Sequence, residues 1–460
     1  MPLKTVQAEG VPQAWPEYPL AVRGGGFVFV SGTRGGRPDG QAGSFSDVPS
    51  VLSKNSQGFW LVDEQEGDAT SDAWNAHARM DTILKAAGTQ SDQILRQRMW
   101  QKDKRFFPVL ERVRKFCQPE AAPSSGLGVS SVGGRFGRWY GIESIAVDPE
   151  HPNYLGPRRV LTPALHAANP SASIYSQMVA SGPLVFLAGH IPIRTAEPRK
   201  PVVASFDDIP EQGRFLATGR SHPDARDGPI AAQTWFVYNE IQRALESNEM
   251  SMRDIVHVRV YLSDLRDLAI FHRVHTHFFA SSAPAMTIVG FDEVGHKGCR
   301  IEIEPTALLP GRLQRTDVSW NCGRPYSGPA ACRAGPLLFF AGMLGIDSKG
   351  CIATSADSVG TEVEFIRSLE DASSSPSLPA QVWWAWRRLL DTCKASGLGI
   401  DCIAKTVVYL REESDVAVYE AIRSKLHPHA QPAFDCVFVQ NPGPIESVAV
   451  QIDATAVHCD

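Results

Sequence analysis

The 460-residue sequence has no apolar run of the roughly 18 residues that a bilayer-spanning helix needs. Residues 1–20 contain no apolar segment of the kind found in secretory signals. The nine cysteines are scattered and form no Cys-x-x-Cys pair, which argues against a zinc ribbon or a disulfide framework. We therefore expect a reduced, cytoplasmic protein that contacts no membrane.

Positive charge is also scarce, because 45 Lys and Arg residues face 50 Asp and Glu residues, for a net charge of −5. This balance predicts no general attraction to nucleic acids or anionic surfaces. The sequence also lacks a Gly-Lys-Ser/Thr phosphate loop and a Gly-x-Ser-x-Gly nucleophile elbow. The chain is too long for a single hydrophobic core, so two to four domains are expected.

One short sequence motif, called here the repeated phrase, occurs three times. It consists of a turn, a short apolar strand and a small residue followed by glycine. It reads "GGGFVFVSGTRG" near the start, "SGPLVFLAGHIP" in the middle and "AGPLLFFAGMLG" further on. A tryptophan in a helical pattern follows each copy, at Trp74, Trp235 and Trp383. The offsets are 161 residues (235 − 74) and 148 residues (383 − 235), and matched isoleucines at positions 94, 255 and 403 repeat both. Three tandem copies are therefore predicted.

The periodicity of the middle copy predicts its elements. Strands are expected at 184–191, 255–264, 285–291 and 300–309, and helices at 231–248 and 268–279. This order indicates an α+β fold in which each copy is a mixed sheet with two helices on one face. Proline-rich stretches place the domain boundaries, giving 1–150, 151–312 and 313–460.

The middle copy closely resembles the Rid family (reactive intermediate deaminases, also called YjgF or endoribonuclease L-PSP proteins). The resemblance rests on "AQTWFVYNEIQRALESNEMSMRDIVHVRVYLSD", "APAMTIVG" and "IEIEPTAL". The third copy matches clearly, and the first is more diverged, with longer insertions. Family members are homotrimers with active sites between subunits. Three copies in one chain thus imply chorismate-mutase-like domains that close into an intramolecular pseudo-trimer barrel, either alone or as a higher homo-oligomer.

The resemblance also implies two functional positions. Family deaminases hold the substrate carboxylate with the arginine of a Pro-Ala-Arg motif, and a glutamate on the last strand positions the attacking water. The matched arginine position reads Ser125, Met286 and Phe434 in the three copies. The glutamate position reads Gly141, Glu302 and Gln451. All copies have lost the arginine, and one copy keeps the glutamate.

Glu302 is therefore the first candidate catalytic residue. It shares one strand face with Glu304, and partial burial in a cleft would raise its pKa. An ion-paired or solvated strand residue is the competing interpretation. Tyr175 is the second candidate, at the family's substrate-covering tyrosine, although a tyrosine packed at a domain interface fits the pattern equally. The substrate-binding candidates are Met286, Thr287, His190, Arg300, His272, Arg34, Tyr18, Tyr326, Phe434 and Gln451.

The expected function is hydrolysis of a small conjugated imine, enamine or enol ether between domains, without cofactor or metal. The histidines of "FHRVHTHFF" include no His-x-x-x-His pair, which argues against a metal site. Two alternatives stay open: a non-catalytic pseudo-trimer that binds a metabolite or docks a partner, and a chorismatase-like hydrolase. A ribonuclease is disfavoured because the acidic chain lacks a basic stripe.

Overall fold

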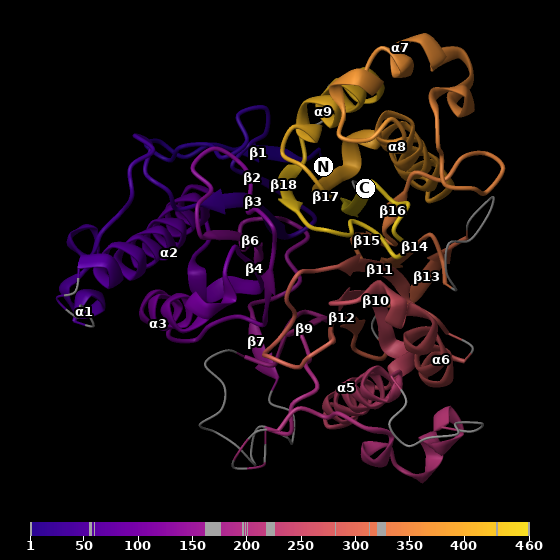
Figure 1. The fold of residues 1–460 in the computed structure, drawn as a ribbon, viewed down its shortest axis with the longest axis horizontal. Coiled ribbons are helices and arrows are strands. Elements are labelled where there is room, and N and C mark those ends of the chain that lie inside the picture. Colours follow the sequence, from indigo (N-terminus) through magenta and orange to yellow (C-terminus); the bar gives the residue numbers. More distant parts are fainter. Residues whose placement is uncertain are drawn as a thin grey trace.

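Three sheets with the same strand order make up the computed structural model (Figure 1). We call them the first unit (β1–β6), the second unit (β7–β12) and the third unit (β13–β19). The triplicate order confirms the three tandem copies and the α+β class. The structure describes residues 2–54, 58, 60–161, 176–195, 197, 199, 201–217, 226–280, 282–311, 313–319, 328–428 and 431–458.

The first unit has the strand order β1-β2-β3-β6-β4-β5, in which β4 and β5 are parallel and the other neighbours antiparallel. The second unit repeats it as β7-β8-β9-β12-β10-β11, and the third as β13-β14-β15-β19-β17-β18, with the short β16 on β19. The strands of the first unit are β1 (Lys4–Val6), β2 (Ala21–Gly24), β3 (Phe27–Arg34), β4 (Ile94–Gln101), β5 (Ser124–Gly128) and β6 (Tyr140–Val147). Those of the second are β7 (Arg159–Leu161), β8 (Met178–Ser181), β9 (Leu184–Leu187), β10 (Ile255–Leu262), β11 (Ala285–Gly290) and β12 (Ile301–Leu308). Those of the third are β13 (Arg315–Val318), β14 (Ala331–Ala334), β15 (Leu337–Phe340), β16 (Met343–Leu344), β17 (Ile403–Leu410), β18 (Ala433–Phe438) and β19 (Gln451–Val457).

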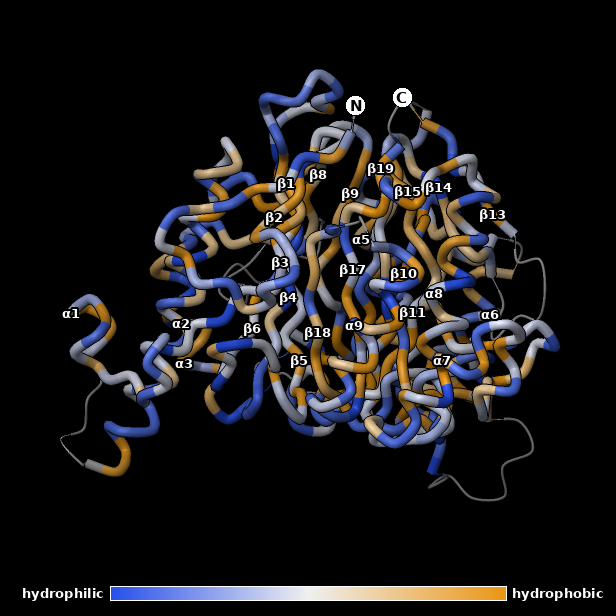
Figure 2. Tube along the Cα trace, turned by 90° about the horizontal axis from the view of Figure 1, so that it is seen from above, coloured by the Kyte–Doolittle hydropathy of each residue, from blue (hydrophilic) through white to orange (hydrophobic). Residues whose placement is uncertain are grey.

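Two longer helices cover the outer face of each sheet, while the strands gather in the middle of the molecule (Figures 1 and 2). Their buried faces carry the apolar residues predicted from the helical spacing, including Trp235 and Trp383, which are both buried. The helix pairs are α2 (Trp60–Ala86) with α3 (Phe107–Cys117), α5 (Gly228–Glu246) with α6 (Leu268–Phe279), and α8 (Leu378–Ala395) with α9 (Asp415–Leu426). The short helices are α1 (Ser50–Ser53) and α7 (Val363–Arg367).

The predicted elements of the middle copy are confirmed, with small changes at their ends. The strand expected over 184–191 ends at Leu187, because the chain bends at the Ala188-Gly189 corner. His190 keeps a single bridge to Ile303 beyond that bend. No helix in the described part of the chain is long and apolar enough to cross a membrane.

The three units surround a common centre (Figure 1). Single antiparallel bridges join neighbouring units, at Gly128–Glu293, Ser131–Phe438 and Gly290–Asn441. Within the described residues no sheet closes on itself, so the expected barrel takes the form of three separate sheets. Buried apolar side chains from different units pack together between the sheets.

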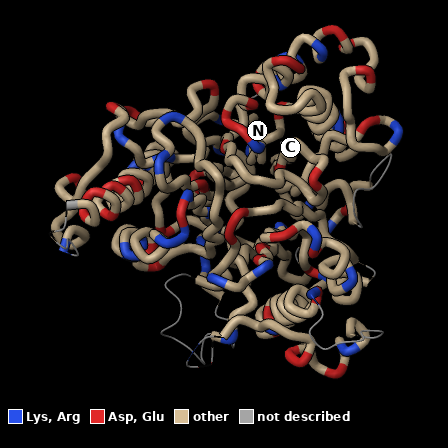
Figure 3. Tube along the Cα trace, in the orientation of Figure 1, with Lys and Arg blue, Asp and Glu red and all other residues tan. Residues whose placement is uncertain are grey.

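Charged side chains form a buried network at this centre, and Figure 3 shows that acidic and basic residues occur in the middle of the molecule as well as at its surface. The nitrogen–oxygen distances are 2.8 Å for Arg98–Glu143, 3.2 Å for Arg98–Glu304 and 3.1 Å for Arg259–Glu304. Arg259 also binds Asp453, and Lys405 binds Glu143. We call this alternating series the central ion chain; its members are Lys405, Glu143, Arg98, Glu304, Arg259 and Asp453.

Candidate active site between the first and second units

Glu302 is placed by strand β12, where it pairs with Tyr261 of β10 and is 3% exposed. Glu304 lies two residues further along the strand and shares the face of Glu302, as the alternation predicts. That face is turned toward the first unit, where the Ser125 hydroxyl on β5 donates to Glu304 Oε2 at 2.9 Å and also hydrogen-bonds to Glu302. The retained glutamate therefore lies at an interface between two units.

The two neighbouring carboxyl groups have opposite properties. Burial raises the pKa of Glu302 to about 7. The positive charge of Lys104 is the largest effect that opposes this rise, followed by the hydrogen bonds from Ser125 and the Gly295 backbone. Burial acts on Glu304 as well, but three surrounding arginines hold the pKa of Glu304 well below its usual range. Near neutral pH, Glu302 is thus divided between its protonated and ionised forms, which suits a group that moves protons.

Gly189 at the repeated corner leaves the space that Glu302 fills. A Cβ at this position would lie 1.9 Å from Glu302 Oε1 and 2.6 Å from Ser125 Oγ. The backbone N–H of Gly189 donates to the Ser124 carbonyl across the interface at 3.1 Å. The glycine of the repeated phrase is therefore needed for the close approach of the two units at this carboxyl group.

The structure moves the arginine position of the first unit by one residue. On β4 and its equivalents, Arg98 and Arg259 occupy matched positions, and they pair with Ser125 and Thr287 respectively. The residue matched to Met286 is therefore Ser124. The prediction of Ser125, which follows from counting residues after the proline of the motif, was wrong by one residue. A one-residue change of register turns a side chain to the opposite face of the sheet, so Ser125 contacts the central carboxylates instead.

Lys104 is a site residue that sequence reasoning missed. It lies in the single turn Lys104–Phe106 after β4, where the Asp103 side chain accepts the N–H of Arg105 and fixes the turn. The half-buried Lys104 Nζ donates to the Gly126 carbonyl at 2.6 Å and lies 5.3 Å from the centre of the Phe107 ring. Burial lowers its pKa, while the charge of Glu302 opposes this change. The repeat offsets could have revealed it, because the matched residues, Leu265 and Glu413, carry no positive charge.

Two further polar groups of the first unit belong to this region. Gln101 is fully buried, and neither atom of its amide has a hydrogen-bond partner among the described residues. A Cβ on Gly126 would lie 2.9 Å from Gln101 Nε2, so the amide approaches the residue that binds Lys104. Burial raises the pKa of Glu111, whose Oε2 accepts from Arg114 at 2.8 Å.

Arg114 also donates to Ser124 Oγ at 2.5 Å, so a guanidinium from α3 contacts the residue at the arginine position. Cys299 is close enough to be influenced by Glu302 and Lys104, but burial raises the pKa of its thiol to about 11. A thiol in that state is a poor nucleophile at neutral pH. Within the described ranges, no three His, Cys, Asp or Glu side chains gather in a way that could hold a metal ion.

The interface between the second and third units contains Met286, Thr287 and Gln451. The Gln451 amide donates to the carbonyls of Ile288 and Pro442, at 2.8 Å each. A Cβ on Gly342 would lie 2.0 Å from Gln451 Oε1, so this corner repeats the geometry of Gly189 and Glu302 with an amide. Met286 and Thr287 are fully buried. This interface keeps the shape of the first one but has no carboxyl group at the glutamate position.

The interface between the third and first units is filled by its own side chains. The Tyr18 ring stacks on Phe434 with 3.9 Å between ring centres, and its hydroxyl donates to Glu420. Arg34 is buried, donates to Asp435 at 2.6 Å, and lies where a side chain on Gly141 would extend. Side chains of both units, including Tyr18 and Phe434, therefore fill this interface. The ion pair of Arg34 takes the space at the glutamate position.

The remaining predicted residues supply no charged group to this interface or lie outside the described residues. Burial lowers the pKa of the half-buried His190 to about 4, so its ring is neutral at neutral pH and supplies no positive charge. Arg300 donates to Asp267 at 2.7 Å near the start of α6. His272 is half-buried on α6 and is matched by the repeat offset to Glu111. Tyr175 and Tyr326 lie outside the described residues.

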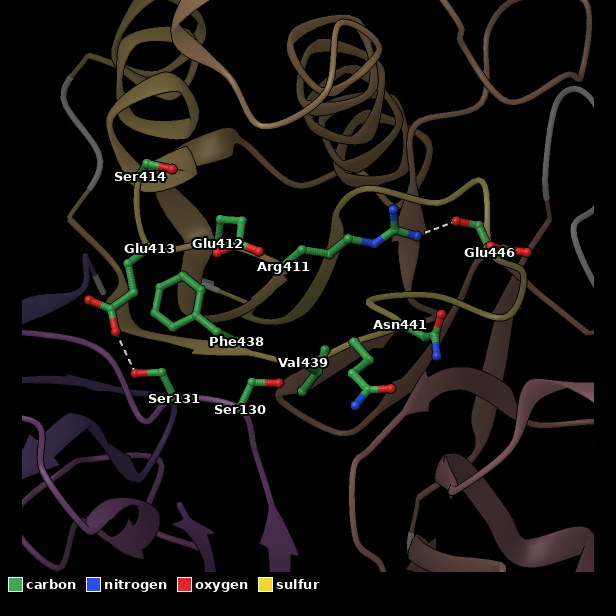
Figure 4. Close-up of a pocket in the computed structure, with 11 residues that line it drawn as sticks. Ser130, Ser131, Arg411, Glu412, Glu413, Ser414, Phe438, Val439, Asn441 and Glu446 are labelled. Carbon is green, nitrogen blue, oxygen red and sulfur yellow. Dashed lines mark hydrogen bonds between the residues drawn. The ribbon is translucent and has the colours of Figure 1, made fainter. Parts of the chain in front are cut away.

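A separate pocket of about 710 Å³ opens between the first and third units (Figure 4). Ser131 donates to Glu413 at 2.5 Å across it, and Arg411 donates to the Glu446 carbonyl. None of the residues predicted from the sequence lines this pocket. Its lining residues are Ser130, Ser131, Arg411, Glu412, Glu413, Ser414, Phe438, Val439, Gln440, Asn441 and Glu446.

Comparison with known proteins identifies relatives that match about a third of the chain. The model of the family "Endoribonuclease L-PSP" matches residues 166–309. A RutC family protein of Pyrococcus abyssi is 32% identical over 133 residues, which cover 29% of this chain and 84% of the relative. A 2-iminobutanoate/2-iminopropanoate deaminase of Dermatophagoides farinae is 26% identical over 157 residues, covering 34% and 99% of the two chains. The crystal structure of yeast Mmf1 covers 31% of this chain and 91% of its own, at 24% identity and a TM-score of 0.24.

Proposed function

The chain belongs to the endoribonuclease L-PSP family, and from this premise we propose that it hydrolyses a small conjugated imine or enamine to a carbonyl compound and ammonia. The reaction takes place between the first and second units, with Glu302 as the group that moves protons. The observation that carries the proposal is the placement of Glu302, buried at this interface against Gly189 and Ser125, where burial raises its pKa to about 7. A relative whose name specifies a 2-imino acid deaminase supports the substrate class.

A single carboxyl group near half-protonation can serve both steps of this hydrolysis. Protonated Glu302 donates its proton to the imine nitrogen, and the resulting carboxylate then takes a proton from the water that attacks the iminium carbon. In the tetrahedral carbinolamine the Glu302 carboxyl group gives its proton to the amino nitrogen and its carboxylate takes the hydroxyl proton as the C–N bond breaks, so ammonia and the carbonyl compound are the products. One water is consumed, and Glu302 returns to its starting state.

We further propose that only one of the three interfaces is active. The matched position carries Gln451 at the second interface, and the Arg34–Asp435 pair occupies it at the third. Neither an amide nor a paired guanidinium exchanges protons at neutral pH. A chain with three tied units can keep one working site, because its interfaces are no longer forced to be identical.

The proposal is tested with imines generated in situ by an amino-acid oxidase, on small, aromatic and acidic side chains, with an enol ether added to the panel. Ammonia and carbonyl release are followed for the wild type and for Glu302→Gln. Glu364→Gln is the matched control, because its side chain is 83% exposed and distant in sequence from the interface. The proposal is supported if the wild type and Glu364→Gln accelerate the release of ammonia and carbonyl compound and Glu302→Gln does not. No acceleration on any substrate would refute it and favour a non-catalytic binding protein.

The proposed role of Glu302 also predicts how activity depends on pH. Because the protonated carboxyl group starts the reaction, kcat/KM should be constant below about pH 7 and fall above it. An ordinary glutamate would place this midpoint near its usual pKa of 4.5. The measurement is kcat/KM from pH 5.5 to 9, after subtraction of the uncatalysed rate. A profile that stays flat across this range would contradict a proton transfer by Glu302.

A further inference from the structure

We propose that Lys104 binds the anionic end of the substrate and thereby determines specificity, a role that rests on the hydrolysis proposed above. The arginine position of the first unit carries Ser124, which is uncharged and already accepts a hydrogen bond from Arg114. Arg114 is committed to Glu111 as well. A negatively charged substrate group at this interface therefore needs a different partner.

Lys104 has hydrogen-bonding capacity left over. An ammonium group has three N–H donors, and one of them is used by the Gly126 carbonyl. Among the residues that the structure describes, no carboxylate lies within ion-pair distance of Lys104 Nζ. Glu302, Glu293 and Glu111 raise the pKa of Lys104 by their charge, but none of them forms an ion pair with it in the described part of the chain. A half-buried cation in this state is stabilised further by a ligand that supplies a directly paired anion.

Lys104 also lies close to the reacting group. Its partner Gly126 directly follows Ser125, whose hydroxyl hydrogen-bonds to Glu304 and Glu302 across the interface. In keeping with this placement, the charges of Lys104 and Glu302 influence each other's pKa values. The buried amide of Gln101, which has no partner in the described part of the chain, approaches Gly126 from within the first unit. Glycine at position 126 leaves the space between these groups free of a side chain. Lys104 and Gln101 thus provide donors on one side of the interface, and Glu302 provides the proton-transfer group on the other.

The matched positions of the other units support the assignment. The residue at the position of Lys104 is Leu265 in the second unit and Glu413 in the third. Leu265 faces the second interface, where its Cδ2 lies 3.3 Å from the position of a Cβ on Gly290. Glu413 hydrogen-bonds across the third interface to Ser131. The residue at this position therefore reaches an interface in every unit. It is positively charged, as Lys104, at the interface that retains the glutamate.

Lys104→Leu is the test, because leucine is the residue that the second unit carries at this position. The variant should lower kcat/KM at least about tenfold for imines that carry a carboxylate, mainly by raising KM. Imines without an anionic group should be affected much less. Lys104→Arg should restore most of the loss, and Lys102→Leu, an exposed lysine on the same loop, should behave as the wild type. An equal loss on charged and neutral imines would overturn the proposal.

Binding of 2-oxobutanoate, followed by isothermal titration, separates this inference from the hydrolysis itself. Loss of 2-oxobutanoate binding in Lys104→Leu would support the inference even if no imine were hydrolysed. A second readout is the pH profile, because Lys104 lowers the pKa of Glu302 and its removal should move the midpoint to higher pH. Unchanged binding in the variant, with an unchanged midpoint, would exclude Lys104 from the site.

Discussion

Glu302→Gln is expected to reduce imine hydrolysis at least about 100-fold, because an amide neither donates nor accepts the transferred proton. The third unit shows that the local fold accepts this change, since Gln451 stands at the matched position with a similar approach to its glycine corner. The loss should therefore appear in kcat rather than in the amount of folded protein. Initial rates of ammonia release at pH 7 provide the measurement. A variant with more than about a tenth of the wild-type rate would exclude Glu302 from the chemistry.

The same variant should be more stable than the wild type at alkaline pH. The folded protein holds Glu302 at a pKa of about 7, whereas the unfolded chain ionises it near 4.5, so ionisation opposes folding. The penalty is absent below pH 4.5, grows between pH 4.5 and 7, and is complete above that range, where it reaches about 3 kcal/mol. Glutamine mimics the neutral form, so Tm should rise at pH 8 and stay nearly unchanged at pH 4.5. This comparison also shows that lost activity is not lost folding.

Arg259→Met is expected to destabilise the protein by about 3–5 kcal/mol, because it breaks the central ion chain between Glu304 and Asp453. Arg259 is 3% exposed and binds Glu304 at 3.1 Å and Asp453 on the neighbouring unit. Its removal leaves Asp453 buried without its ion-pair partner, which is costly, whereas Glu304 keeps Arg96 and Arg98. Chemical denaturation at 25 °C measures the loss, and the interface between the second and third units should open first.

Arg266→Met is the matched control for this prediction. Arg266 binds Asp264 at 2.6 Å, but its side chain is 88% exposed, and exposed ion pairs contribute about 0–1 kcal/mol. Adding Asp453→Asn to Arg259→Met should recover part of the lost stability, since it removes the carboxylate that lost its ion-pair partner. If Arg259→Met cost no more than Arg266→Met, the central ion chain would not be a major source of stability between the units.

Local patterns were sufficient to predict the architecture of each copy. Helical spacing, strand alternation and the constant offsets of 161 and 148 residues reflect contacts within one unit, and the strands and helices confirm them. The alternation along β12 also placed Glu302 and Glu304 on one face. These properties depend on neighbours in the sequence or on positions that repeat, so the sequence carries them directly.

The identity and state of the site residues depended on the tertiary structure. The register of β5 made Ser124, not Ser125, the residue at the arginine position, because pairing with β4 is a contact between distant segments. Lys104 joined the site through a turn whose sequence carries no family motif. The pKa values of Glu302 and Glu304 diverge because one is buried near a single cation and the other among three arginines. Two carboxyl groups that are equivalent along a strand thus became a proton-transfer group and a structural anion, since only the packing of three units decides which charges surround each.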